Sequence, residues 1–285
     1  MTDIMPLLSH CEICPRRCGV DRLKNECGFC GTGRNPKISA YNVHRGEEPP
    51  ISGSRGSGTV FFTGCNMRCV FCQNYPISQM RHGNEVTVDK LAGIMLGLQK
   101  EGVHNINFVT PTHVALQMME AVSAARAKGL DIPVVYNSSG YESVDTLRML
   151  EGTVDVYLPD IKYSDDRRAE KYSSTPGYWA TVCAAVKEMH RQKGVLKMKG
   201  GIAVSGLLVR HLVLPRGIAG SKRVLEFIAR EISKDTYVSI MAQYHPANKT
   251  GGYPELDRKI TASEYSAVLG FANELGLANG WRQEM

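Results

Sequence analysis

Three cysteines close together in the sequence have the spacing of iron–sulfur cluster ligands. Cys65, Cys69 and Cys72 follow one another as C-x3-C-x2-C, directly after a short apolar run at residues 59–63. Three thiolates at this spacing can hold three irons of a [4Fe–4S] cluster and leave the fourth iron without a protein ligand. An open metal position is typical of a catalytic site and not of a structural one. The spacing therefore predicts a reactive cluster.

Two other interpretations of these thiols remain open. They could belong to a structural zinc site completed by a distant histidine or cysteine, or they could be three buried apolar side chains. Zinc ligands usually come as C-x2-C with a second pair further along the chain, and no such pair follows Cys72. The cluster is therefore the favoured interpretation.

Five further cysteines form a second group near the N-terminus and also indicate metal. Two C-x2-C pairs resemble a zinc ribbon, and thiolate-bound zinc can fold a short segment of this kind. The surplus thiol and the sequence Cys14-Pro15 equally permit an auxiliary iron–sulfur cluster. A disulfide framework is disfavoured in a reducing compartment. We therefore expect a second metal site, zinc or iron–sulfur, among Cys11, Cys14, Cys18, Cys27 and Cys30.

The composition indicates an ordinary globular protein. Its 285 residues, 43% of them apolar, suit one large α/β domain with an appendage or two small domains. The net charge of +6 is scattered and forms no basic run typical of nucleic-acid binding, although a basic surface suits an acidic electron donor or a phosphorylated small molecule. No apolar run reaches the roughly 18 residues that cross a bilayer, and the first residues lack the features of a signal peptide. We expect a cytoplasmic protein without nucleic-acid or membrane partners.

The order of the elements predicts an incomplete barrel. Strand-like apolar runs alternate with amphipathic helical patterns from residue 59 onward. Such alternation implies a mainly parallel sheet with right-handed crossovers, and six units suit a partial (β/α)6 TIM-like barrel better than a closed barrel of eight. The active site then belongs at the carboxyl ends of the strands. The predicted strands are residues 59–63, 105–109, 133–136, 154–158, 207–213 and 237–241, and the predicted helices are residues 88–101, 112–128, 143–150, 178–192, 222–232 and 261–275.

The beginning of the chain breaks this rhythm. Residues 1–58 are rich in Cys, Gly and Pro and have little periodicity, so we expect a Cys-rich metal-binding appendage there and the barrel over residues 59–285. Two polar stretches, residues 163–176 and 245–259, follow strand ends. They are candidates for substrate loops, although plain surface loops are the commoner outcome.

On these residues the chain resembles the radical SAM superfamily. The signature of that superfamily is C-x3-C-x2-C with an aromatic residue before the last cysteine, here Phe71. Beyond the signature, the chain is similar over nearly its whole length to the branch of pyruvate formate-lyase activating enzyme-like proteins. The stretches that carry this similarity are residues 51–58, 105–113, 135–142, 157–163, 209–215 and 241–246.

The resemblance implies a fold, a cofactor and a reaction. It implies a partial barrel of radical SAM type in which the catalytic residues Cys65, Cys69 and Cys72 hold a [4Fe–4S] cluster. The open iron then chelates S-adenosylmethionine, whose reductive cleavage yields a 5′-deoxyadenosyl radical that abstracts hydrogen from a substrate. A flavodoxin- or ferredoxin-type protein is the expected electron donor. The resemblance also implies a regular set among the N-terminal cysteines, with Cys27 as an extra: Cys11, Cys14, Cys18 and Cys30.

Polar residues at the ends of predicted strands are the expected contacts of S-adenosylmethionine. The resemblance gives an Asp-x-Lys such as Asp160 and Lys162 the role of contacting the cofactor's carboxylate and ribose; a salt-bridged pair at the barrel rim is the alternative. His113 is either a ligand or proton donor, or a helix cap or surface residue. Arg210 and His211 face opposite ways along one strand, so one of them is expected to point inward. The full expected set is Phe71, Asn74, Thr110, His113, Asn137, Ser139, Asp160, Lys162, Arg210 and His211.

Three hypotheses about the function follow. The first is activation of a glycyl radical enzyme, a protein substrate, which the overall resemblance supports. The second is radical modification of a small molecule or a protein side chain, which is favoured by the N-terminal cysteines and by the absence of a ferredoxin-like insertion after Cys72. The third is a non-catalytic iron–sulfur electron carrier, against which the open-site spacing and the pair Asp160 and Lys162 argue.

Overall fold

The computed structural model describes residues 5–284. Within this range ten strands form one sheet, in the order β10-β9-β8-β6-β5-β4-β2-β1-β3, with β7 paired to β8. Neighbouring strands from β2 to β10 along this path run parallel, whereas β1 and β3 are antiparallel additions at one edge. The strands are β1 (Lys37–His44), β2 (Ser57–Phe62), β3 (Asn84–Glu85), β4 (Ile106–Val109), β5 (Val134–Ser138), β6 (Val156–Pro159), β7 (Lys197–Lys199), β8 (Ile202–Leu212), β9 (Tyr237–Met241) and β10 (Gly280–Arg282).

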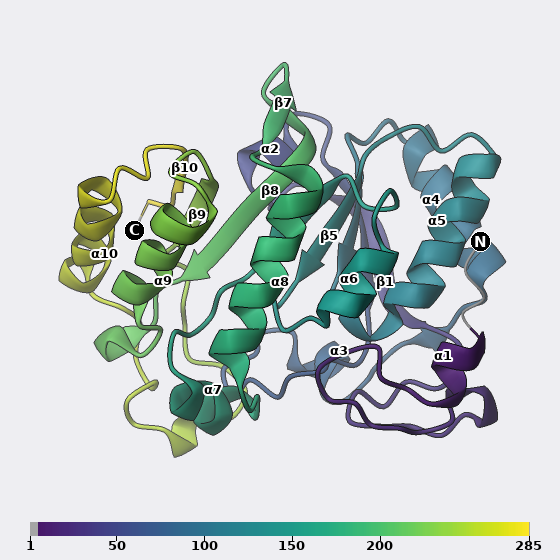
Figure 1. Cartoon of the computed structure of the whole chain (residues 1–285), viewed down its shortest axis with the longest axis horizontal. Helices are drawn as coiled ribbons and strands as arrows, with labels where there is room; N and C mark the ends of the chain where they lie inside the picture. Colours follow the sequence, from purple (N-terminus) through teal and green to yellow (C-terminus); the bar gives the residue numbers. More distant parts are fainter. Residues whose placement is uncertain (1–4, 285) are drawn as a thin grey trace.

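Helices connect successive parallel strands and cover one face of the sheet (Figure 1). The α-helices are α1 (Met5–Ser9), α2 (Pro49–Ser52), α3 (Tyr75–Ser78), α4 (Val88–Lys100), α5 (Ala115–Ala127), α6 (Val144–Met149), α7 (Asp166–Ser173), α8 (Tyr178–Lys193), α9 (Ser221–Phe227) and α10 (Ala262–Glu274). The short helical turns are η1 (Arg22–Lys24), η2 (Thr112–Val114), η3 (Pro215–Gly217), η4 (Ile228–Ile232) and η5 (Thr250–Gly252).

This arrangement confirms the predicted partial (β/α)6 barrel. All six predicted strands and all six predicted helices are present, with ends shifted by a few residues or, as at residues 222–232, with a helix divided in two. Apolar side chains on both faces of the central strands are buried, as in β5, where the consecutive residues Val134, Val135 and Tyr136 are fully buried and alternate between the faces. One short parallel strand, β10, extends the sheet beyond the six predicted units.

Part of residues 1–58, the segment expected to form the Cys-rich appendage, pairs with the sheet. Residues 37–44 form β1, which pairs with β2 in antiparallel fashion from His44 opposite Ser57 to Ile38 opposite Phe62. The middle of β1 is exposed, so it lacks the apolar alternation by which a half-buried strand is recognised. β1 therefore belongs to the sheet, and the cysteine segment precedes it.

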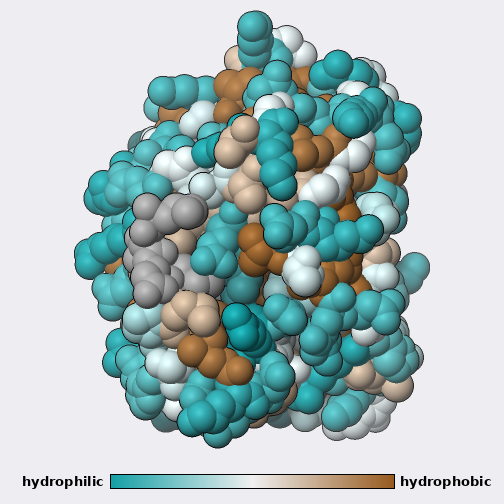
Figure 2. All heavy atoms as spheres, turned by 90° about the vertical axis from the view of Figure 1, so that its right-hand side faces the viewer, coloured by the Kyte–Doolittle hydropathy of each residue, from teal (hydrophilic) through white to brown (hydrophobic). Residues whose placement is uncertain are grey.

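The strands direct their carboxyl ends toward one end of the molecule (Figure 1). The N-terminal cysteine segment, α3 and α7 lie at that end, and α2 and β7 lie at the opposite end. The face that carries α4 and α5 is mostly hydrophilic, with apolar atoms visible in patches between polar side chains (Figure 2). In the part of the chain that the structure describes, no helix has the length and apolar character needed to span a membrane.

Candidate functional site

A chamber of about 510 Å³ opens beside the carboxyl ends of the parallel strands. This volume lies within the range of small-molecule sites, roughly 300–1,000 Å³. Most of the site residues expected from the sequence line it: Cys65, Cys69, Phe71, Cys72, Asn74, Thr110, Asn137, Ser139, Asp160, Lys162 and Arg210. Their role as contacts of S-adenosylmethionine stays a prediction, but the fold brings them to one place.

The catalytic loop, residues 63–74, leaves the end of β2 through a glycine turn. Gly64 has φ +80°, and a Cβ there would stand 2.6 Å from the carbonyl oxygen of Cys30. Only glycine fits both the conformation and the close approach of the N-terminal segment. The first thiol of the motif, Cys65, follows directly, so its position depends on this turn.

Each sulfur of the catalytic loop has a polar neighbour. The Ser173 hydroxyl donates to the Cys69 sulfur at 3.0 Å, and the Met67 amide donates to the Cys65 sulfur at 3.4 Å. The third sulfur, of Cys72, lies 3.2 Å from the Ser78 hydroxyl. Hydrogen bonds to cluster sulfurs tune the reduction potential of an iron–sulfur cluster. The donors thus come from the loop itself at Met67 and from the neighbouring helix α7 at Ser173.

The two polar stretches that were candidates for substrate loops support the catalytic loop instead. Among the described residues, none from 163–176 or 245–259 lines the chamber. The Val70 amide donates to the Tyr172 carbonyl, and the Lys249 amide donates to the Val70 carbonyl, both at 2.8 Å. The two stretches also bind each other, because the Tyr172 hydroxyl donates to Glu255 at 2.6 Å. The two stretches bind the catalytic loop and do not line the chamber, so the chamber gives no support to the candidate role as substrate loops.

The buried thiols of the catalytic loop do not converge on a position for one ion. Burial raises the pKa of Cys65 to about 12 and that of Cys69 to about 11, so these thiols ionise only when a cation compensates the thiolates. Over residues 5–284, no three His, Cys, Asp or Glu side chains converge on a position for a single metal ion. In an iron–sulfur cluster each thiolate binds a different iron, so the ligands stand further apart.

A charged network occupies the chamber next to the thiols. Asp160, just beyond β6, accepts hydrogen bonds from Lys162 at 2.5 Å and from Arg210 on β8 at 2.7 Å. Although burial raises the pKa of Asp160, the two cations outweigh it and hold that pKa below its usual range. Arg210 also donates to Asn137 at 2.6 Å and to Glu47 at 3.2 Å. The salt-bridged alternative and the cofactor role are therefore compatible, because the pair lies inside the chamber and not on an outer rim.

Two acidic residues missing from the sequence-based prediction complete this network. Glu47 accepts hydrogen bonds from Asn107 at 3.2 Å and from Asn137 at 3.3 Å. Glu48 is 2% exposed, its Oε2 has no hydrogen-bond partner, and burial followed by the Glu47 charge raises its pKa, against the effect of Arg210. We call Glu47, Glu48 and Arg210 the charged floor of the chamber. The only sequence signal was an acidic pair before two prolines, in a segment assigned to the appendage.

The turn after β4 is strained where it meets the chamber. Thr110 lines the chamber with φ +60°, a left-handed conformation that is uncommon for a residue other than glycine. Its amide donates to the Asn137 carbonyl at 2.9 Å, which holds it there. Strain of this kind persists only where the surroundings fix it and is common at functional sites.

Two histidines expected near S-adenosylmethionine lie elsewhere. His211 is fully buried and bonds the Ile161 carbonyl at 2.7 Å and the Ser221 hydroxyl of α9 at 2.8 Å. It faces away from Arg210, so Arg210 is the inward member of that pair. His113 bonds the Thr63 carbonyl at 2.7 Å and lines a different cavity. Burial lowers the pKa of each histidine to about 4, so both rings are neutral.

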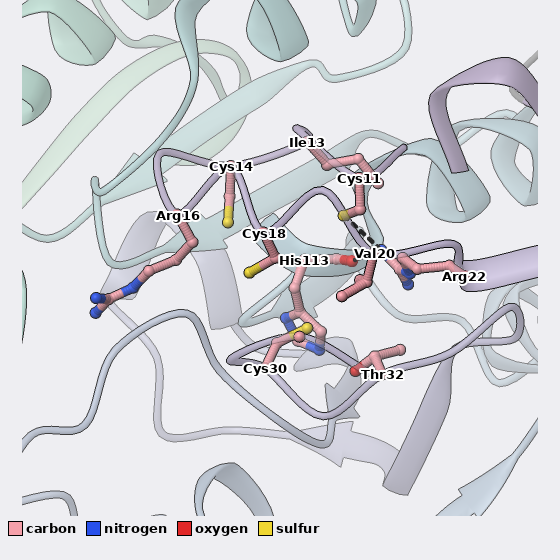
Figure 3. Close-up of a pocket in the computed structure, with 11 residues that line it drawn as sticks. Cys11, Ile13, Cys14, Arg16, Cys18, Val20, Arg22, Cys30, Thr32 and His113 are labelled. Atoms are coloured by element: carbon pink, nitrogen blue, oxygen red, sulfur yellow. Dashed lines mark hydrogen bonds between the residues drawn. The ribbon is translucent and has the colours of Figure 1, made fainter. Parts of the chain in front are cut away.

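That second cavity contains four of the five N-terminal cysteines (Figure 3). The fifth, Cys27, is exposed, and its sulfur donates to the Asn25 carbonyl at 3.5 Å. The structure therefore brings together a different set from the two C-x2-C pairs of a zinc ribbon, because Cys18 takes the place of Cys27. The residues around this cavity are Cys11, Cys14, Cys18, Cys30, Arg22 and His113.

Comparison with known proteins identifies the class to which this fold and site belong. Residues 59–204 match the family described as the Radical SAM superfamily, which is more than half of the chain. The chain therefore belongs to the radical SAM superfamily, in which S-adenosylmethionine is cleaved with an iron–sulfur cluster.

Two proteins of Methanocaldococcus jannaschii are similar to most of the chain. The uncharacterized protein MJ0674 is 31% identical over 281 residues, which cover 95% of this chain and 76% of that protein. The uncharacterized protein MJ0808 is 26% identical over 265 residues, which cover 86% of this chain and 73% of that protein. The similarity thus extends well beyond residues 59–204.

Solved structures share the fold at low sequence identity. The maturase HydG from Carboxydothermus hydrogenoformans superposes with a TM-score of 0.54 and 10% identity over 80% of this chain and 54% of its own. Streptococcus suis SuiB bound to S-adenosylmethionine superposes with a TM-score of 0.54 and 10% identity, over 77% of this chain and 48% of SuiB. Methylornithine synthase PylB superposes with a TM-score of 0.51 and 14% identity, over 75% of this chain and 62% of PylB. The chain spans about half the length of HydG and SuiB, and identities this low show the fold alone.

The residues of the chamber fit the cofactors of the superfamily. Cys65, Cys69 and Cys72 are free thiols that line one space and are too dispersed for a single ion. They are the residues that would hold the cluster. Asp160 and Lys162 line the same space with opposite charges, which suits the zwitterionic end of S-adenosylmethionine.

Proposed function

We propose that this protein is a radical SAM enzyme that abstracts a hydrogen atom from a polar small molecule or a polar side chain. The observation that carries the proposal is the single chamber of about 510 Å³, which joins the three thiols of the catalytic loop to the charged floor. S-adenosylmethionine bound at the open iron supplies the 5′-deoxyadenosyl radical by reductive cleavage. The chain's own residues then have to bind, orient and shield the reacting groups.

Positioning of S-adenosylmethionine is the role of the network beside the thiols. Lys162 is 17% exposed at its side chain and Asp160 13%, so both charges act where water screens them little. Lys162 suits a carboxylate and Asp160 suits an ammonium or hydroxyl group. Phe71 and Tyr244, whose rings lie 5.7 Å apart, form an apolar wall of the chamber that limits the entry of water.

The charged floor favours a polar substrate. Glu48 lines the chamber, and its buried Oε2, 4.0 Å from Arg210 Nη1, accepts no hydrogen bond from the described residues, so a hydrogen-bond donor would offset its burial. A hydroxyl, amide or amine of a substrate supplies such a donor. A backbone glycine loop brings no charged group to match Glu47, Glu48 and Arg210. We therefore place small-molecule or side-chain modification first.

Glycyl radical activation is the second candidate. The sequence resembles activating enzyme-like proteins, and the chamber extends from strands near one edge of the sheet to the strand at the other edge. His44 on β1 and Phe61 on β2 line the chamber near one edge of the sheet, and Trp281 on β10 lines it at the opposite edge. An extended peptide entering between these edges would reach the same thiols.

An acidic electron donor of flavodoxin or ferredoxin type is part of this proposal. Reductive cleavage needs one electron for each S-adenosylmethionine, and the net charge of +6 favours association with an acidic protein. Because surface attraction of this kind is screened by salt, the rate with a flavodoxin should fall as ionic strength rises, whereas the rate with dithionite should change little.

The first experiment measures 5′-deoxyadenosine after anaerobic reconstitution with iron and sulfide and reduction with dithionite. The wild type should form 5′-deoxyadenosine, and the variants Cys65→Ala, Cys69→Ala and Cys72→Ala should not. If the wild type loads iron normally and still forms none, the proposed function is wrong.

The second experiment separates the two kinds of target. Glu48→Gln should leave uncoupled cleavage of S-adenosylmethionine nearly unchanged and reduce transfer of deuterium from a labelled small-molecule substrate into 5′-deoxyadenosine. Glycyl radical activation would be supported instead if Glu48→Gln and the wild type formed a stable radical in a partner protein equally well. The exposed Glu101→Gln is the matched control.

A further inference from the structure

The four cysteines of the N-terminal cavity come from two loops that close on each other. The Cys11 amide donates to the Val20 carbonyl, and the Gly19 amide donates to the Cys11 carbonyl, both at 3.0 Å. The sulfur atoms of Cys11, Cys14, Cys18 and Cys30 lie around one space (Figure 3). Cys18 packs so closely on Gly28 that a Cβ there would stand 2.7 Å from its sulfur. Backbone hydrogen bonds and the close packing on Gly28 thus fix the positions of these thiols.

A buried cation without a counter-charge lines the same space. Arg22 is 1% exposed and donates to two carbonyl oxygens, of Gly33 at 2.8 Å and of His113 at 2.7 Å. Its Nη2 has no partner, and no carboxylate of the described residues pairs with it. A buried guanidinium is costly unless a negative charge compensates it. A metal centre ligated by four thiolates is an anion and supplies that charge.

His113 gives a second sign of a missing group. Its ring is 1% exposed and lines the cavity, and the bond from one ring nitrogen to the Thr63 carbonyl leaves Nδ1 without a partner. Buried polar atoms in native proteins are almost always paired with protein, water or a bound group. The unpaired atoms of Arg22 and His113 thus belong to two different elements that meet at one cavity.

The cavity is too wide for one zinc ion. In a zinc site the sulfurs stand about 2.3 Å from the metal and leave no free space between them. Here a free volume of about 10 Å³ remains among the lining residues, which is about the room of one water molecule. The described residues also contain no three ligands that converge on one ion. The three thiols of the catalytic loop share this wide arrangement.

We infer that Cys11, Cys14, Cys18 and Cys30 hold a second [4Fe–4S] cluster, fully ligated by protein. Four thiolates occupy all four irons, so this cluster has no open position for S-adenosylmethionine. Phe29, beside Cys30, donates its amide to the Cys18 sulfur at 3.5 Å. This bond corresponds to the one from the Met67 amide to the Cys65 sulfur in the catalytic loop.

The second cluster lies directly against the catalytic loop. Arg16 donates to the Asn66 carbonyl at 2.8 Å and stacks on the Phe29 ring, 3.7 Å from its centre. On the other face of the contact, Arg68 donates to the Phe29 carbonyl and lies 4.3 Å from the same ring centre. The two cysteine segments are therefore joined by the side chains of Arg16 and Arg68, each of which donates to a backbone carbonyl of the other segment.

The test counts iron, sulfide and zinc in protein reconstituted anaerobically. The wild type should bind about eight iron atoms, and a triple variant Cys65→Ala, Cys69→Ala and Cys72→Ala should keep about four iron and four sulfide. The reduced triple variant should give the electron paramagnetic resonance signal of a [4Fe–4S] cluster that does not change when S-adenosylmethionine is added. One zinc per chain in place of iron, or no metal at all in a folded triple variant, would overturn the inference.

Single substitutions at exposed cysteines keep the test informative if multiple variants do not fold. Cys18→Ser should lower the wild-type iron content by roughly half or leave an incomplete second cluster, while Cys27→Ser should not change it. Equal iron content in both variants would contradict the assignment of the four ligands. Loss of 5′-deoxyadenosine formation with both iron signals intact would reject the proposed function and leave this inference standing.

Discussion

The two cysteine groups of this protein differ in the number of thiols that they offer to a metal centre, and therefore in whether another ligand can bind it. The catalytic loop brings three thiols to a chamber of about 510 Å³ with charged residues opposite, whereas the N-terminal segment brings four thiols to a space of about 10 Å³. In the first, a cluster keeps one open iron beside room for a ligand. In the second, protein ligands and packing fill the surroundings. One missing thiolate and a large adjoining space distinguish a reactive site from a closed one.

The groups also differ in the charge that surrounds them. Asp160 near the catalytic thiols is paired with Lys162 and Arg210, so the chamber already contains compensated charges that a ligand can rearrange. Arg22 in the N-terminal cavity pairs with no carboxylate of residues 5–284, so it depends on the proposed cluster for compensation. The contrast predicts that mutations in the chamber affect ligand binding, and that mutations around the N-terminal cavity affect metal content.

The largest effect is expected from removing a catalytic thiol. Cys69→Ala should reduce 5′-deoxyadenosine to the uncatalysed background, because the cluster loses a ligand and the Ser173 hydroxyl loses its acceptor. Cys183→Ala, outside both groups, is the control and should retain activity. Chromatography of the quenched reaction measures both. Normal cleavage by Cys69→Ala would remove the distinction between the two groups.

The next largest effect is expected at Asp160. Asp160→Asn leaves Lys162 and Arg210 with one carboxylate fewer in a buried setting, where breaking an ion pair costs about 3–5 kcal/mol. We expect a destabilisation near the lower end, about 3 kcal/mol, because Glu47 still pairs with Arg210. Binding of S-adenosylmethionine should weaken as well.

Thermal unfolding and equilibrium binding measure these two consequences separately. The exposed Asp131→Asn is the matched control. A variant as stable as the wild type that also binds S-adenosylmethionine normally would show that the network is not part of the cofactor site.

The sequence predicted the chamber better than its floor. Asn137 and Asp160 could be predicted because carboxyl ends of parallel strands meet at one edge and each follows a clear apolar run, whereas the sequence left open which of Arg210 and His211 points inward. Glu47 and Glu48 lie outside the βα rhythm and reach the chamber only because β1 returns the chain to the sheet. No local pattern encodes that return, since most of β1 is exposed.

The resemblance implied the four cysteines that the N-terminal cavity brings together, whereas spacing alone did not. The types and number of cysteines indicated metal, but spacing alone paired Cys27 with Cys30, as in a zinc ribbon. The structure turns Cys27 to the surface and places Cys18 and His113 at the cavity instead. His113 comes from the turn after β4, distant in sequence, so its contribution depends on the tertiary fold.

One buried carboxyl group near the turn after β4 should make the stability of the protein depend on pH. Glu142 is 2% exposed and accepts hydrogen bonds from Thr112 at 2.5 Å and Tyr136 at 3.1 Å. Thr112 precedes His113, so Glu142 supports the turn that reaches both cysteine groups. Burial raises the pKa of Glu142 from its ordinary value of 4.5 to about 7, despite these hydrogen bonds.

This shift predicts a loss of stability as the pH rises. Between about pH 4.5 and pH 7 the native state binds the proton that the unfolded state releases, so the free energy of unfolding falls by about 3 kcal/mol over this window. Glu142→Gln should remove that fall and be more stable than the wild type at pH 8. Denaturant unfolding at pH 5 and pH 8 measures it, with Glu101→Gln as the control. The same pH dependence in the wild type and Glu142→Gln would refute the prediction.

The smallest effect is expected from removing one donor to a catalytic sulfur. Ser173 is fully buried and donates to the Cys69 sulfur at 3.0 Å. A hydrogen bond to a charged group contributes about 1.5–3 kcal/mol, and it favours the reduced cluster because that state is more negative. Ser173→Ala should therefore lower the reduction potential of the catalytic cluster and slow cleavage of S-adenosylmethionine by a weak donor. The iron content should not change.

A redox titration followed by electron paramagnetic resonance distinguishes this effect from misfolding. Only the signal that changes on adding S-adenosylmethionine should shift, because Ser173 contacts Cys69 and does not line the N-terminal cavity. Ser266→Ala, on the exposed side of α10, should shift neither signal. If Ser173→Ala moved both potentials equally, the two groups would be electronically one site. Their difference in ligand number would then not explain their roles.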